Sequence, residues 1–177
     1  VDIRVLDDAG GLVPQDGKSI GEVCARSNVV FKGYWEQPDE TAAAISDGYF
    51  HTGDLSVWDD SGSIHIVDRK KDVIISGGEN ISSSDIEAVL YEHAAVIECA
   101  VIGVPHEKWG ETIKALVVLA EGHGGSDGAG IDEQALIDHC RAKLAHFKCP
   151  TSVEFRGELA RTATGKLQKF KLRAPYW

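Results

Sequence analysis

A block of consecutive charged residues, Asp68-Arg69-Lys70-Lys71-Asp72, separates two stretches of different pattern. Before it, short runs such as 1–6 and 20–25 alternate apolar and polar residues between Gly and Asp turns, which is typical of antiparallel strands. After this block, helix-like and strand-like segments alternate along the chain. The sequence therefore predicts an α+β chain in two parts, a β-rich part over residues 1–68 and a small α+β part over residues 69–177.

The first part also carries signals for one helix and one hairpin. The dipeptide Pro38-Asp39 favours a helix start shortly before residues 42–45. Residues 59–62, Asp-Asp-Ser-Gly, join two strand candidates, 55–58 and 63–67, into a hairpin. Up to Asp68 the chain is therefore expected to be mostly β.

In the second part the helix and strand signals alternate. Residues 84–87 fit a capping box in which Ser84 is the expected N-cap. Two apolar runs, 96–104 and 113–120, are expected to be central strands of a sheet. Residues 131–147 are the clearest predicted helix, with helical spacing of Leu136, Cys140, Leu144 and Phe147. The remaining expectations are a Gly-rich surface loop over 121–130, a strand over 153–155 and a last helix beginning within 166–172.

Charge and composition exclude several classes of function. The 177 residues include 18 Lys plus Arg and 28 Asp plus Glu, for a formal net charge of −10. This balance disfavours a nucleic-acid partner, because binding to a polyanion depends on positive charge, so any phosphate must be met by a few local cations. No apolar run reaches the ~20 residues of a membrane span and no secretory signal is present, so a soluble, cytoplasmic protein is expected. Because the chain starts with Val1 and contains no Met, we expect it to be a piece of a longer protein.

The sequence predicts no catalytic or metal-binding role for the cysteines or the histidines. The cysteines lack metal-ligand spacing and tight pairing, so they are interpreted as reduced small hydrophobic residues and no metal site is predicted. The seven histidines form no HExxH or Ser/His/Asp signature. The residues concerned are Cys24, Cys99, Cys140 and Cys149, with His51, His65 and His139 among the histidines.

Two short motifs are candidates for ligand contacts, each with a plain structural alternative. In Thr52-Gly53-Asp54 the carboxylate can accept hydrogen bonds from two neighbouring hydroxyls, as acidic residues do with ribose. An ordinary turn is the alternative, and it is favoured for the tripeptide alone. In Ser76-Gly77-Gly78 the backbone amides can approach an anion closely. The favoured alternative there is a β-to-α turn that needs glycine only for its backbone angles.

A third candidate is the segment Thr162-Ala163-Thr164-Gly165-Lys166, which offers hydroxyls, a glycine and an ammonium. It is not a Walker loop, because Ala160 stands at the position of the first glycine and Leu167 follows the lysine. Lys166 on a mobile loop can still reach a phosphate and stabilise developing negative charge, and a solvated turn is an equally weighted alternative. The basic residues 69–71 can be a solvated connector, as charge runs usually are, and their position at the change of pattern favours a hinge over a binding patch.

Taken together and in order, these features resemble the motifs of the adenylate-forming superfamily, which includes acyl-CoA synthetases, aryl-CoA ligases, luciferases and peptide-synthetase adenylation domains. The resemblance covers nearly the whole chain. Its motifs are, in order, Gly33-Tyr34-Trp35 with Pro38 and Thr41, then Asp47-Gly48-Tyr49-Phe50-His51-Thr52-Gly53-Asp54, Asp68-Arg69-Lys70-Lys71-Asp72, Ser76-Gly77-Gly78-Glu79-Asn80-Ile81 with Glu87, and Arg161-Thr162-Ala163-Thr164-Gly165-Lys166.

The resemblance implies a two-step ligase with a small mobile C-terminal domain. A carboxylate attacks ATP to give an acyl adenylate and pyrophosphate, and a thiol, usually that of coenzyme A (CoA), then displaces AMP. The implied nucleotide contacts are Asp54 to the ribose, Arg69 to ribose or phosphate, and Lys166 to the reacting carboxylate and phosphate. Lys166 is thereby the expected catalytic residue of the first step. Lys71 is the implied hinge about which the C-terminal domain rotates between the steps.

The resemblance also implies contacts with CoA. These are expected at Ser76, Gly77 and Gly78, and at Lys148 by a weaker local match. Ile75 stands where luciferase-like and coumarate-ligase-like members carry a lysine, so no cation is expected there in the second step. The family keeps its phosphate loop, adenine-stacking motif and acyl pocket upstream, and Mg²⁺ is expected to bind with ATP mainly in that missing N-terminal domain. The isolated chain is therefore expected to lack turnover.

On this resemblance, residues 1–68 are the last β-rich subdomain of a large N-terminal domain, and residues 69–177 are the C-terminal domain of an AMP-forming acyl-CoA synthetase. A fatty acid is the expected carboxylate, from the wording Ile-Ile-Ser-Gly-Gly-Glu-Asn at 74–80. The alternatives are an amino-acid or aryl adenylation enzyme, and a non-catalytic module that binds a carrier protein. No residue in the chain decides the acyl chain length, the thiol acceptor or the oligomeric state.

Overall fold

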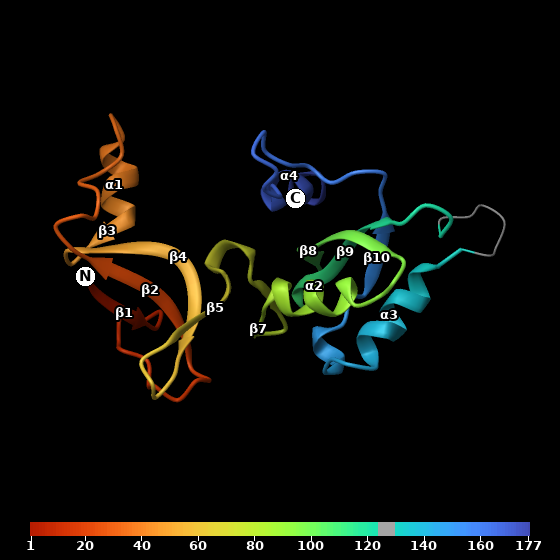
Figure 1. The fold of residues 1–177 in the computed structure, drawn as a ribbon, viewed down its shortest axis with the longest axis horizontal. Helices are drawn as coiled ribbons and strands as arrows, with labels where there is room; N and C mark the ends of the chain where they lie inside the picture. The colour runs from red at the N-terminus through yellow and green to blue at the C-terminus, as the bar shows by residue number, and fades with distance from the viewer. Residues whose placement is uncertain (124–129) are drawn as a thin grey trace. The chain divides into compact units, whose positions relative to one another are not determined.

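The computed structural model describes residues 1–123 and 130–177 and divides into two compact units, Val1–Lys71 and Asp72–Trp177 (Figure 1). The sequence places the boundary after Asp68, whereas this division falls after Lys71. The difference has a physical reason, because Arg69 and Lys70 form ion pairs with Asp54 and Glu22 of the first unit.

The first unit is an antiparallel sheet with one helix. Its strands are β1 (Asp2–Leu6), β2 (Ile20–Arg26), β3 (Ile45–Ser46), β4 (Tyr49–Trp58) and β5 (Ile64–Arg69), and its helix is α1 (Pro38–Ala44). The strand order is β1-β2-β4-β3, and β5 also pairs with β4. The predicted hairpin is confirmed: the Asp59 carboxylate accepts hydrogen bonds from the amides of Ser61 and Ser63, each at 2.9 Å, and this closes the turn between β4 and β5.

The second unit is a mixed α+β layer. Its strands are β6 (Ile74–Ser76), β7 (Glu79–Ile81), β8 (Val96–His106), β9 (Gly110–Leu119) and β10 (Ser152–Phe155). Its helices are α2 (Ser83–Tyr91), α3 (Glu133–Arg141) and α4 (Lys169–Arg173), with short 3-10 turns at His146–Lys148 and Ala174–Tyr176. Strand β9 pairs antiparallel with β8 and parallel with β10. The expected α+β class is confirmed.

Both faces of the β8–β9 pair are buried, which explains why these strands are apolar at successive positions. Successive side chains of a strand point to opposite faces, and the two faces here pack into two separate cores. One core joins the pair to α2 and α3 through Val101, Ile113, Ala115, Val117, Ile86, Leu90, Leu136 and Cys140. The other joins it to α4 and the segment before it through Ala100, Ile102, Val104, Leu116, Val118, Leu159 and Leu172.

Helix α2 begins two residues earlier than the capping-box pattern predicts. Ser82, not Ser84, is the N-cap, and its hydroxyl accepts a hydrogen bond from the Asp85 amide at 3.3 Å. The Glu87 carboxylate on α2 accepts a hydrogen bond from the Val101 amide of β8 at 2.7 Å.

The helix predicted over residues 131–147 is shorter in the structure. It begins after the N-cap Asp132, whose carboxylate accepts from the Ala135 amide at 2.8 Å, and it ends at Arg141. Phe147 is 52% exposed rather than buried on a helix face. Further on, the short 3-10 turn at His146–Lys148 ends at Cys149, which is extended because it directly precedes Pro150.

Three further expectations can be compared with the structure. The last helix begins at Lys169, within the predicted range, and β10 confirms the predicted strand. Most of the loop expected over 121–130 lies outside the described residues. No helix within residues 1–123 and 130–177 is both long and apolar enough to cross a membrane.

The β8 strand was expected to be central, yet within the described ranges it pairs with β9 alone. Side chains of α2 cover its other edge: Val101 donates to Glu87, and the Cys99 amide donates to the Tyr91 hydroxyl at 3.3 Å. An edge strand that is covered in this way needs no further strand partner.

A largely buried ion pair ties α4 to the same edge. The Lys169 ammonium lies 2.7 Å from Glu87 Oε1 and donates to the Ser83 hydroxyl at 2.7 Å. The Lys169 and Glu87 side chains are only 15% and 16% exposed. Lys166 lies two residues before Gln168, the N-cap of α4, so this pair also anchors the end of the Lys166 segment.

We predict that Lys169→Met lowers the free energy of unfolding of the chain by about 1–3 kcal/mol, because Glu87 loses a partner inside the fold. A double-mutant cycle with Glu87→Gln should give a coupling of roughly 0.5–3 kcal/mol in urea titrations. The control is Lys143→Met, which breaks an exposed pair with Glu92 and should cost less than about 1 kcal/mol. Equal costs for the two lysines would contradict this account.

Candidate functional site

The first candidate residues, Asp54 and Arg69, lie opposite each other on β4 and β5. Arg69 Nε is 2.6 Å from Asp54 Oδ1, and the side chains are 56% and 31% exposed. The strand register thus places an acid and a guanidinium side by side at the surface. This arrangement leaves carboxylate lone pairs of Asp54 accessible to hydroxyl donors and orients the acid through the guanidinium.

Thr52, Gly53 and Asp54 are part of β4, so the interpretation of this tripeptide as an ordinary turn is wrong. The Thr52 hydroxyl donates to the Val23 carbonyl at 2.8 Å and accepts from the Asp54 amide at 3.1 Å. Gly53 has a φ of 72°, which other residues adopt only with strain. The strand is therefore locally distorted just where it presents Asp54.

Glu22 on β2 supports this distortion, and the sequence analysis missed it. Its carboxylate accepts from the Gly53 amide at 2.9 Å through Oε1, while Oε2 lies 3.2 Å from His51 Nδ1 and 3.3 Å from Lys70 Nζ. Burial by itself would raise the pKa of Glu22, but the hydrogen bonds from His51 and Gly53 and the Lys70 ammonium lower it overall. A lone acid inside an apolar strand was the available signal in the sequence.

Lys70 connects this carboxylate to the end of the first unit. Its ammonium also lies 3.0 Å from Asp8 Oδ1, and the hydrogen bond to Asp8, followed by that to Glu22, raises the pKa of Lys70 against the opposing effect of burial. Lys71, the candidate hinge, follows directly in the short 3-10 turn at Lys70–Asp72 and is the last residue of the first unit.

The Gly77-Gly78 pair forms the two-residue turn of the β6–β7 hairpin, with φ of 61° and 88°. Positive φ at both positions is typical of a primed hairpin turn, which explains the two glycines. The predicted β-to-α turn is therefore wrong, since β7 intervenes before α2. The sequence analysis also missed Trp109: its carbonyl accepts from the Gly77 amide at 2.9 Å, and a Cβ on Gly77 would lie 3.0 Å from its ring.

Lys148 ends the 3-10 turn at His146–Lys148, where its ammonium donates to Asp85 Oδ2 at 3.0 Å. The two side chains are 32% and 46% exposed. Ion pairs with this exposure contribute little to stability, so the ammonium can exchange Asp85 for another anion at small cost.

Lys166 lies on a tight turn rather than on a loose loop. The Thr162 amide donates to the Lys166 carbonyl at 2.8 Å, and the Lys166 amide donates to the Thr162 hydroxyl at 3.0 Å. Arg161 braces the same turn by donating to the Gly165 carbonyl at 2.7 Å. The backbone of the turn is thus fixed while the Lys166 side chain is exposed.

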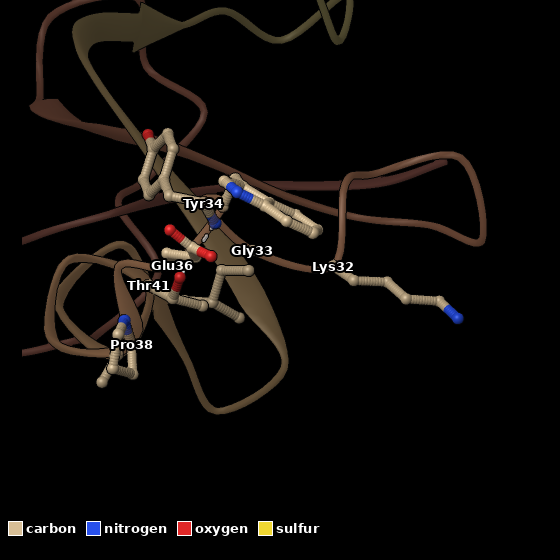
Figure 2. A pocket seen from close by; sticks show the side chains of 9 residues that line it. Lys32, Gly33, Tyr34, Glu36, Pro38 and Thr41 are labelled. Carbon is tan, nitrogen blue, oxygen red and sulfur yellow. Dashed lines mark hydrogen bonds between the residues drawn. The ribbon is translucent and has the colours of Figure 1, made fainter.

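The motif at Gly33-Tyr34-Trp35 lines an open hollow of about 550 Å³ on the first unit (Figure 2). The Thr41 hydroxyl accepts from the Tyr34 amide at 2.9 Å and donates to the Gln37 carbonyl at 2.8 Å, which ties the motif to the start of α1. Figure 2 shows the Lys32 side chain extending away from the other labelled residues. Trp35 is 86% exposed.

The structure therefore groups the predicted site residues by unit. Asp54 and Arg69 are brought together in the first unit. Lys166, Lys148 and the turn at Ser76, Gly77 and Gly78 belong to the second unit, and Lys71 ends the first.

Comparison with known proteins identifies the second unit. The sequence profile described as "AMP-binding enzyme C-terminal domain" matches residues 85–166. Residues 85–166 belong to this family. The chain is also 46% identical over 172 residues to 4-hydroxybutyrate--CoA ligase 2 of Metallosphaera sedula, covering 97% of this chain and 30% of that protein. A feruloyl-CoA synthase of an Amycolatopsis species is 45% identical over 172 residues, covering 97% of this chain and 33% of that protein.

A solved structure extends the likeness beyond the AMP-binding enzyme C-terminal domain to the first unit. ATP-bound MatB of Rhodopseudomonas palustris matches with a TM-score of 0.88 and 38% identity, over 99% of this chain and 34% of that chain. The expected resemblance to adenylate-forming enzymes is confirmed. The chain spans about a third of the length of the relatives it matches.

Proposed function

We propose that this chain is the C-terminal part of an AMP-forming ligase that activates a carboxylic acid with ATP and transfers the acyl group to the thiol of CoA. The observation that carries the proposal is the Asp54–Arg69 pair, held on neighbouring strands with its carboxylate accessible. Two relatives, one named a CoA ligase and one named a feruloyl-CoA synthase, are at least 45% identical over nearly the whole chain and support the reaction class.

In the proposed reaction Asp54 accepts hydrogen bonds from the two ribose hydroxyls of ATP, and Arg69 keeps its carboxylate oriented. Glu22 holds the Gly53 amide and so fixes the backbone from which Asp54 projects. Mg²⁺ is expected to accompany ATP. Asp54 fits poorly as a metal ligand because its Oδ1 already contacts Arg69 at 2.6 Å, so we assign Mg²⁺ no ligand in this chain.

Lys166 acts in the first step by charge and position. The attacking carboxylate and the α-phosphate are both anionic, and an ammonium between them stabilises the negative charge that develops on bond formation. The closed turn from Thr162 to Lys166 limits backbone motion, so the flexible part is the side chain alone.

For the second step, we propose that the unit after Lys71 rotates and that the hairpin turn at Ser76, Gly77 and Gly78 then lines the path of the thiol. Trp109 would form one wall of this path, because its ring already lies against Gly77. Lys148 would contact a CoA phosphate in place of Asp85.

The carboxylate is proposed to be a fatty acid or another aliphatic acid, and an aryl acid is the second candidate. The relative named for 4-hydroxybutyrate supports the first, and the one named for feruloyl-CoA supports the second at nearly equal identity. Parallel assays of the full-length enzyme with fatty acids of several lengths and with ferulate distinguish the two classes.

We predict that Lys166→Ala in the full-length enzyme lowers the rate of ATP–pyrophosphate exchange by about 10²–10³-fold, since charge stabilisation of the first step is lost. Thiolysis of a supplied acyl adenylate should stay within a few-fold of wild type. Lys171→Ala, an exposed lysine on α4, is the matched control. Exchange at the wild-type rate in the Lys166 variant would remove Lys166 from catalysis.

We further predict that Lys71→Pro slows thiolysis more than adenylation, because proline fixes one backbone angle at the pivot. Single-turnover rates of the two half-reactions provide the measurement. Lys71→Ala, which leaves the backbone angle free, should keep both rates near wild type. Equal loss in both half-reactions of the proline variant would argue for misfolding instead of a blocked hinge.

A further inference from the structure

Three side chains with different metal-binding atoms meet on the first sheet, away from the proposed acyl and thiol chemistry. Cys24 on β2 lies directly opposite His51 on β4, and Glu22 is two residues from Cys24 along the same strand. One ligand atom from each, a sulfur, a nitrogen and an oxygen, lie within 4.8 Å of one another. His51 is 27 residues from Cys24 in the sequence, and Glu22 is two residues from Cys24 on the same strand. This spacing matches no common metal-binding sequence motif.

The separations of these atoms suit a small tetrahedral cation. His51 Nδ1 lies 3.4 Å from Cys24 Sγ and 3.2 Å from Glu22 Oε2. With zinc–sulfur bonds of ~2.3 Å and zinc–nitrogen or zinc–oxygen bonds of ~2.0–2.1 Å, adjacent ligands of a tetrahedral site are roughly 3.3–3.6 Å apart. Two of the three ligand separations are therefore already close to those of a bound site.

The outer contacts of the ligands are also in place. Ser46 Oγ lies 2.9 Å from His51 Nε2, and the Gly53 amide donates to the second oxygen of Glu22 at 2.9 Å. Partners of this kind orient metal ligands and are a regular part of zinc sites. Cys24 is fully buried and the Glu22 side chain is 10% exposed, while His51 is 29% exposed and leaves one side open to solvent.

One group competes with a cation here. The Lys70 ammonium lies 3.3 Å from Glu22 Oε2, but it also lies 3.0 Å from Asp8 Oδ1 and is 48% exposed. It can leave Glu22 and keep Asp8 as its partner. Burial first, then the Glu22 charge, raises the pKa of the Cys24 thiol to about 11, so the thiol is protonated at neutral pH. Metal binding would replace the S–H bond by a metal–sulfur bond and release the proton to solvent.

We propose that Glu22, Cys24 and His51 form a binding site for a thiophilic divalent cation of the Zn²⁺ type, with water as the fourth ligand. Mixed sulfur, nitrogen and oxygen donors favour Zn²⁺ and Co²⁺ over Mg²⁺ or Ca²⁺, which prefer oxygen alone. The site does not depend on the proposed ligase activity, since it is defined by the first unit alone.

The test is a Co²⁺ titration of the reduced, metal-free 177-residue chain. We expect one equivalent to produce the near-ultraviolet charge-transfer absorption of cobalt–thiolate bonding and the visible bands of tetrahedral cobalt, and Zn²⁺ to abolish both. Cys24→Ser should remove the charge-transfer band, and His51→Gln should weaken binding at least tenfold. Cys149→Ser and His65→Gln, which leave the three donors untouched, should bind as wild type.

Variants that lose Co²⁺ binding could do so because they misfold, so a variant that should bind Co²⁺ more tightly provides an independent test. Lys70→Met removes the competing ammonium and should tighten Co²⁺ binding about fivefold, which corresponds to roughly 1 kcal/mol. Circular dichroism of each variant reports whether the sheet is intact. Absence of the thiolate band in the folded wild-type chain, or a band that survives Cys24→Ser, would overturn the proposal, as would a Lys70→Met variant that binds more weakly.

Discussion

The register between β4 and β5 is the constraint on which the proposed nucleotide site depends. It places Asp54 opposite Arg69, so that an acid and a guanidinium meet without help from any other element. Glu22 on the neighbouring strand then holds Gly53 and contacts Lys70. The same sheet therefore presents the ribose-binding candidate and carries the chain to Lys71, where the second unit follows.

The second unit is organised around the β8–β9 hairpin, which is buried on both faces. Helices α2 and α3 cover one face of β8 and β9, and α4 with its preceding segment covers the other. The pair of Lys169 with Glu87 joins these layers at the edge of β8 that α2 covers. Lys166 is thus presented from a braced turn that is anchored on both sides by packed structure.

Local patterns in the sequence predicted much of this fold and part of the site. Period-two runs gave β1, β2 and the β4–β5 hairpin, because such strands have one buried face. The cap of α2 was misplaced because three consecutive serines, Ser82 to Ser84, offer equivalent hydroxyls and only tertiary packing selects one. The contacts of Glu22 and Trp109 join distant segments, and local pattern does not encode such contacts. Glu87 was noticed as a motif residue, but its role at the β8 edge appears only once the strands are paired.

The proposed nucleotide site depends on Asp54 as the group that binds the ribose. The most direct measurement compares the affinities of the full-length protein for AMP and for 2′,3′-dideoxy-AMP, in wild type and in Asp54→Asn. Hydrogen bonds to a charged acceptor contribute about 1.5–3 kcal/mol each, so the wild-type enzyme should prefer AMP by roughly tenfold or more, and the variant should lose most of that preference. Equal affinity of the wild-type enzyme for both nucleotides would contradict the account.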